Sequence, residues 1–236
     1  MGTLINVATI VAGGMLGLIL GSRLSERIRI TIVYALGLFT FAYGLQMFMK
    51  TQNSLIVLIS LIIGVILGEW WQIEKRLENV GVWIESKINH GKTAEGANSR
   101  FVLGFLTASL VFCVGPMAIL GAFQDGLTGD YGTLAVKAII DGFTAMAFAS
   151  SLGIGVVFSF LPVLVYQGGL TLLAAQIQTV VTEPMMLEMS ATGGIILLAI
   201  AFSSLLEIKK IRAGNFLPAL VIAPILVAIA SAMGLY

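Results

Sequence analysis

Long apolar runs separated by short polar stretches dominate the chain. Most runs have about the 17–25 residues that an α-helix needs to cross a bilayer core. The pattern predicts eight spans: Leu4–Leu20, Ile30–Met49, Leu55–Trp71, Phe101–Phe123, Leu134–Leu152, Gly153–Gln176, Ala191–Leu206 and Phe216–Leu235. If residues 132–176 fold partly as re-entrant segments, the count drops to six or seven. We expect an all-α, polytopic transmembrane helical bundle with six to eight spans, in a single membrane domain over residues 1–236.

The polar stretch 69–100 is the longest interruption of this pattern. Its part WWQIEKRLENVGVWIESKI predicts an amphipathic helix on the cytoplasmic face, with tryptophans at headgroup level. The apolar positions at helical spacing are Ile73, Leu77, Val80, Ile84 and Ile88, and the tryptophans are Trp70, Trp71 and Trp83. The following NHGKTAEGANSR is typical of a flexible linker, so residues 70–100 join the third and fourth spans. A regulatory or partner-binding helix is the alternative.

Lysine and arginine are distributed unevenly between the predicted loops. Cytoplasmic loops carry the excess of basic residues. With the N-terminus outside, 11 of the 13 Lys and Arg residues fall on the inner side, and only Lys50 and Lys137 lie elsewhere. This favours an even number of spans, with the N-terminus and the C-terminus both outside.

The composition agrees with a lipid environment. Hydrophobic residues make up 58% of the 236 residues and charged residues 11%, whereas a soluble domain carries roughly a quarter charged residues. The net charge of +1 does not favour nucleic acid as a partner. With Cys113 and His90 as the sole residues of their types, we expect no intrachain disulfide, no multi-histidine metal site and no cofactor. No cleavable signal peptide is evident.

Two predicted spans share a proline-containing pattern. VFCVGPMAILGAFQDGL (111–127) and VFSFLPVLVYQGGL (157–170) both run from VF through proline to Gln-x-Gly-Leu, and FLPALVIAPIL (216–226) is a weaker echo. Such internal repeats with broken helices at Gly115–Pro116 and Leu161–Pro162 are pointers to a transporter binding site. A packing kink is the alternative, because membrane helices contain more Pro and Gly than soluble ones.

Glycines recur one turn apart in the first and third spans. Small residues at this spacing let helices approach closely. The residues are Gly13, Gly17 and Gly21 in the first span, and Gly64 and Gly68 in the third. We expect helix packing within the monomer, and a homo-oligomer interface is the alternative.

An ionisable pair lies inside the fifth span, in KAIIDGFTAM (137–146). A charge at the bilayer centre costs about 2.5–3.5 kcal/mol on insertion scales, so such residues face a cavity or a partner. Lys137 and Asp141 share one helical face at this spacing, which favours a structural pair. Alternatively Lys137 extends outward to the interface and leaves Asp141 to bind a cation or exchange a proton.

Polar neighbours for Asp141 come from several spans. The candidates are Thr107, Ser109, Gln124, Asp125, Thr144 and Gln167, together with the breaks at Gly115, Pro116 and Pro162. By the predicted topology, Asp125 and Asp130 fall in an outer loop, where they are expected as solvated turn residues. Glu69 lies at the inner interface, where a charge needs no special reason.

Several of these segments carry a family resemblance. GTLINVATIVAGGMLGLILGSRLSERIR, SLIIGVILGEWWQIEKRLE, VGPMAILGAFQDGL, KAIIDGFTAMAFASSLGIGV and LPVLVYQGG resemble the bacterial domain-of-unknown-function family 554 (DUF554) over nearly the whole chain. The resemblance implies a multi-pass protein of the bacterial inner (cytoplasmic) membrane. The family's members are described as uncharacterised or as transport proteins, so it assigns no site residues.

These observations favour a secondary transporter of a small solute or cation, coupled to protons or ions through Asp141. An ion channel or oligomeric pore is one alternative, and a membrane scaffold without transport activity is another. An enzyme is not expected, because the sequence offers little material for a nucleophile–base pair or a metal set. The expected partners are the lipid bilayer, a small solute or ion, and a second copy of the chain.

Overall fold

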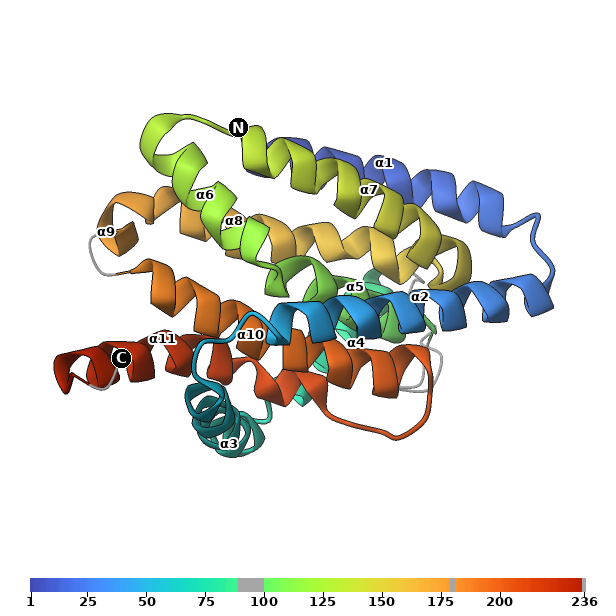
Figure 1. Cartoon of the computed structure of the whole chain (residues 1–236). Helices are drawn as coiled ribbons and strands as arrows, with labels where there is room; N and C mark the ends of the chain where they lie inside the picture. The colour runs from blue at the N-terminus through green and yellow to red at the C-terminus, as the bar shows by residue number, and fades with distance from the viewer. Residues whose placement is uncertain (89–99, 179–180, 235–236) are drawn as a thin grey trace. The chain divides into compact units, whose positions relative to one another are not determined.

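The computed structural model describes residues 1–88, 100–178 and 181–234, and these are folded into helices joined by short connections (Figure 1). The helices are α1 (Gly2–Gly21), α2 (Glu26–Phe48), α3 (Ser54–Trp71), α4 (Ile73–Ile88), α5 (Arg100–Val114), α6 (Pro116–Thr128), α7 (Gly132–Leu152), η2 (Ile154–Ser159), α8 (Phe160–Leu172), α9 (Ala174–Gln178), α10 (Glu183–Ile200), η3 (Ala201–Leu205), η4 (Ala213–Phe216) and α11 (Pro218–Ala232).

The number of membrane spans agrees with the sequence prediction. In the described residues, seven helical segments are long and apolar enough to cross a bilayer. The pair α5 and α6, bent by 61°, makes an eighth if it is counted as one span. The chain is therefore a multi-pass, all-α membrane protein.

The chain forms two compact units that alternate along the sequence. Unit 1 contains Met1–Leu36 and Leu77–Gln176, and unit 2 contains Gly37–Arg76 and Ile177–Tyr236. Helices α2 and α4 each begin in one unit and continue into the other. Each unit is described separately below.

In unit 1, α1 and α7 lie side by side along their length (Figure 1). The contact depends on the glycine stripe of α1, because a Cβ added at any of its three positions would collide with the backbone of α7. The facing pairs are Gly13 with Gly142, Gly17 with Met146, and Gly21 with Ser150. The stripe therefore packs two helices of the same monomer.

In unit 2, α3 packs in the same way against η4 and α11. A Cβ at Gly64 would lie 2.6 Å from the Cβ of Ala219, and one at Gly68 would collide with the backbone of Asn215. A small core of Ile56, Met185 and Val227 joins α3, α10 and α11.

The break predicted at Gly115–Pro116 is present. Gly115 is the extended N-cap of α6, with φ −71° and ψ 144°, and Pro116 is the first residue of that helix. Proline is favoured at this position. An N–H in the first turn would have no partner within the helix, so proline loses nothing by lacking one.

The break predicted at Leu161–Pro162 is wrong in position. Pro162 lies in the first turn of α8, where proline is tolerated. The chain instead departs from α-helix earlier, at Gly153 with φ 87° and in the 3₁₀ segment η2. A left-handed φ is readily adopted only by glycine, so the irregularity is set by Gly153 rather than by the proline.

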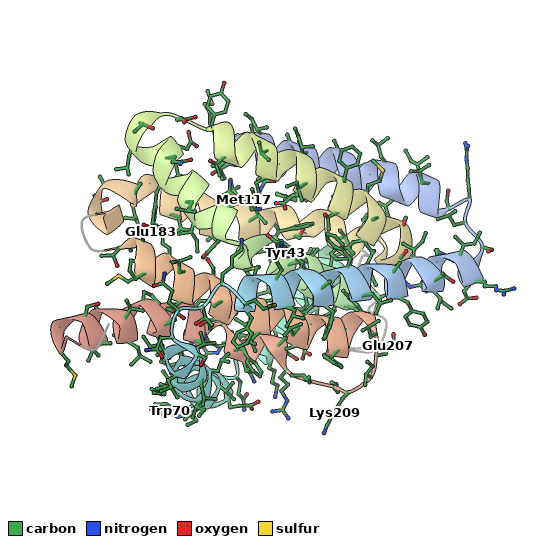
Figure 2. The ribbon with its side chains drawn as sticks, in the orientation of Figure 1. Tyr43, Trp70, Met117, Glu183, Glu207 and Lys209 are labelled. Atoms are coloured by element: carbon green, nitrogen blue, oxygen red, sulfur yellow. The ribbon has the colours of Figure 1, made fainter. Side chains whose placement is uncertain are left out.

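The amphipathic helix is present as α4. Its Ile84 is buried against Phe101, Val102 and Phe105 of α5, so part of its apolar face covers protein. Trp70 at the end of α3 and Trp83 are 77% and 62% exposed (Figure 2 labels Trp70), and their headgroup position stays a prediction. His90 and the predicted linker up to residue 99 lie outside the described residues.

Candidate functional site

The ionisable pair of α7 is formed and buried. The Lys137 ammonium donates a hydrogen bond to Oδ2 of Asp141, one helical turn away. The two side chains are 5% and 9% exposed. The interpretation in which Lys137 extends outward and leaves Asp141 alone is therefore wrong, because the lysine gains more from its buried counter-charge than from the interface.

Asn6 of α1 connects this pair to α8. Its Nδ2 donates to Asp141 Oδ2 at 3.0 Å and to Gln167 Oε1, also at 3.0 Å. Gln167 Nε2 in turn donates to the Thr3 hydroxyl at 3.3 Å. Asn6 is fully buried and Gln167 is 1% exposed. We call the residues joined in this way the polar network: Thr3, Asn6, Lys137, Asp141, Gln167 and Thr171.

The polar network has unused oxygen acceptors. Asn6 Oδ1 is buried and has no hydrogen-bond partner among the described residues. Both hydrogen bonds that Asp141 accepts there end on its Oδ2. A buried acceptor without a partner costs free energy, so this site is suited to receive a donor or a cation.

The local sequence explains why the network assembles. α1 can lie close against α7 because Gly13 has no side chain at the contact. This close approach brings Asn6 within hydrogen-bonding distance of Asp141. Pairing with Lys137 offsets part of the cost of burying the carboxylate. The result is one carboxylate held by a lysine and an amide inside an apolar bundle.

Only Gln167 among the six predicted neighbours of Asp141 belongs to the network, and the other five lie outside it. Thr144 and Ser109 donate to backbone carbonyls of their own helices. Gln124 accepts from the Thr133 hydroxyl at an exposed turn. Thr107 is buried with an unpartnered hydroxyl among the described residues. Spacing placed these residues in neighbouring spans but could not indicate the direction of their side chains.

The expectation that Asp125 is a solvated turn residue is wrong. It is 8% exposed, and its Oδ2 accepts from the N-terminal ammonium of Met1, as an ion pair, and from the Gly2 N–H, both at 2.9 Å. It thus caps the N-terminus of α1 from α6. Asp130 is an exposed turn residue, as expected, and accepts from the Gly132 N–H.

The helix breaks contribute less than predicted. Gly115 faces open space, because a Cβ there would meet no atom within 4 Å. Pro162 precedes Gln167 by about one and a half turns of α8. The network members that α8 supplies are Gln167 and Thr171, and neither lies at the predicted break.

Sequence reasoning missed several buried polar residues, Asn6 and Glu188 among them. Asn6 stands in an apolar run, and its isolation there was the available signal. Glu188 of unit 2 is fully buried and accepts from the Thr51 hydroxyl at 2.5 Å and from the backbone nitrogens of Gln52 and Asn53 at 2.8 and 3.0 Å. It thereby holds the turn that precedes α3, whose N-cap is Asn53.

A metal centre made of side chains is not found in the described part of the chain. No three His, Cys, Asp or Glu residues lie together there in a way that could hold an ion.

Comparison with known proteins gives a consistent family assignment. The family model described as "Protein of unknown function (DUF554)" matches residues 1–228. The "Uncharacterized protein YqgA" of Escherichia coli (strain K12) is 34% identical over 223 residues, 94% of each chain. The "Uncharacterized membrane protein YdfK" of Bacillus subtilis (strain 168) is 29% identical over 238 residues, covering 99% of this chain and 98% of the relative. No solved structure matches.

Proposed function

The chain belongs to the DUF554 family, and from that premise we propose that it is a secondary transporter of a small cation or small polar solute. Asp141 would be the carboxylate that binds the solute or exchanges a proton. The sequence carries no phosphate-binding loop of the Walker type, so a gradient would supply the energy.

The observation that carries this proposal is the burial of Asp141 and Lys137 inside a membrane-spanning helix. Ionisable residues in such positions commonly mark ion pathways or proton relays. A purely structural pair would be expected to have its partners fully satisfied, whereas the adjacent Asn6 Oδ1 has no partner among the described residues.

Lys137 has a natural role in this scheme. Its ammonium occupies the place beside Asp141 that a bound cation would take. An incoming cation, or a proton on Asp141, would weaken the pair and free Lys137. Binding would then shift the arrangement of α7 against α1 and α8, which alternating access requires.

The test uses purified protein, first in a thermal-shift screen against Na⁺, K⁺, ammonium and small polar metabolites at several pH values. Hits are then followed as flux into proteoliposomes that contain a pH-sensitive dye. We expect saturable flux for the wild type and at least about a tenfold loss for Asp141→Asn, since one charged hydrogen bond contributes about that factor.

Asp130→Asn is the matched control, because it makes the same change at an exposed turn and should keep the wild-type rate. Asp141→Asn leaves Lys137 buried without a counter-charge, which destabilises proteins. The double variant Asp141→Asn with Lys137→Gln removes both charges and should fold but not transport. Flux that does not saturate and ignores both variants would indicate a channel. Full retention of saturable transport in the double variant would contradict the role of Asp141.

A further inference from the structure

Unit 1 contains a cavity away from the polar network. Its volume is about 190 Å³, which is room for several water molecules. It lies where α1 and α7 end and where α2 and α5 begin. Its polar lining consists of Ser22, Arg29, Arg100, Ser150 and Ser151.

Among the described residues, no carboxylate compensates the positive charge of this cavity. No aspartate or glutamate lines it, and the three ion pairs of the described residues involve neither Arg29 nor Arg100. The Nε of Arg29 is buried and has no hydrogen-bond acceptor among these residues. Since a guanidinium stays protonated at all physiological pH values, this lining suits a negatively charged group.

The turn beside the cavity holds Arg100 in place. Gly153, which lies beside the cavity, adopts φ 87°, and a Cβ there would contact the Cδ of Arg100 at 3.7 Å. The aliphatic part of Arg100 is therefore held close to this turn.

We propose that this cavity binds a phosphate group, with the Arg29 and Arg100 guanidinium groups as its ligands. Arginine presents a planar set of N–H donors that matches phosphate oxygens. The sequence predicts this end of the helices on the inner face, where anionic lipid headgroups are recognised by basic pockets between helices. The headgroup of an anionic phospholipid and free phosphate share the required chemistry.

The test measures binding to the full-length protein in detergent micelles. Phosphatidylglycerol, phosphatidylcholine and inorganic phosphate are titrated separately, and the thermal midpoint is recorded. We expect phosphatidylglycerol to raise the midpoint of the wild type and phosphatidylcholine not to do so. In Arg29→Gln and Arg100→Gln the apparent affinity should fall about tenfold each.

Arg27→Gln is the matched control, because Arg27 lies on the same helix, is exposed and does not line the cavity. It should retain wild-type affinity. Arg29→Lys keeps the charge but not the planar donors, so it should bind more weakly than the wild type and more tightly than Arg29→Gln. Without added lipid, Arg29→Gln should fold as stably as the wild type, because it removes an unpaired buried donor.

The outcomes separate the two sources of phosphate. A response to phosphatidylglycerol alone, lost with Arg29, identifies a lipid headgroup site. A response to inorganic phosphate with the same dependence identifies a site for free phosphate. If neither probe shifts the midpoint, or if Arg27→Gln weakens binding as much as Arg29→Gln, the proposal is overturned. None of these results depends on Asp141.

Discussion

Two buried carboxylates do the same task in the two units. Asp125 accepts from the Met1 ammonium and the Gly2 N–H at the start of α1, and Glu188 accepts from the Gln52 and Asn53 N–H groups in the turn before α3. Both helices are apolar and carry a glycine stripe. A carboxylate from a neighbouring helix therefore holds the chain just where each apolar helix starts, while the Leu55 N–H of α3 is capped by Asn53.

Glu188→Ala is expected to lower the free energy of unfolding by roughly 2–4 kcal/mol, because it leaves two backbone N–H groups and one hydroxyl without their acceptor. Glu188→Gln keeps one acceptor oxygen and should cost less. Chemical unfolding in micelles, followed by tryptophan fluorescence, measures both. Glu183→Ala changes an exposed glutamate of the same helix and should be nearly neutral. Equal losses at positions 183 and 188 would show that Glu188 does not hold this turn.

Among the helices, the pair α1 and α7 depends most on small residues. The polar network forms across this contact, since Asn6 and Asp141 lie on its two sides. Without the glycines, the helices would separate and the hydrogen bond would lengthen. The glycine stripe thus supports the polar network by setting the distance between α1 and α7.

Gly17→Ala is expected to destabilise the protein by roughly 1–3 kcal/mol, the usual cost of overpacking, because the added methyl meets the backbone at Met146. Gly169→Ala is the control, since a Cβ at Gly169 meets no atom within 4 Å and alanine favours helix. Thermal midpoints in one detergent compare the two. A neutral Gly17→Ala would show that α1 and α7 are not in close contact in the protein.

For the whole molecule, the basic residues predict the orientation in the membrane. Lys50 lies in the α2–α3 turn, on the predicted outer side. Lys209 lies in the loop before η4, on the predicted inner side, and both are exposed (Figure 2 labels Lys209). The charge rule that gives this orientation depends on short loops, and both of these loops are short.

Cysteine labelling of intact cells tests the orientation. In a Cys113→Ser background, Lys50→Cys should react with a membrane-impermeant maleimide, and Lys209→Cys should react only after the membrane is permeabilised. The reverse pattern would place the N-terminus inside. Labelling of both sites in intact cells would contradict the even number of spans.

The sequence by itself determined the helical class and the number of spans. Both depend on local properties, since an apolar run of sufficient length forms a helix in lipid whatever its neighbours do. It also placed Lys137 and Asp141 on one face, because i and i+4 positions are adjacent in any helix. The helix break at Gly115–Pro116 was equally local.

Only the tertiary structure decided which polar residues meet. Asn6 and Asp141 are 135 positions apart, and no local pattern relates them. Asp125 was expected in solvent because it ends a span, but its burial depends on where α1 begins in space. Gly153, rather than Pro162, sets the irregularity before α8. Helix packing determines which buried polar groups become partners. The packing itself depends on side-chain volumes at contacts between residues far apart in the sequence.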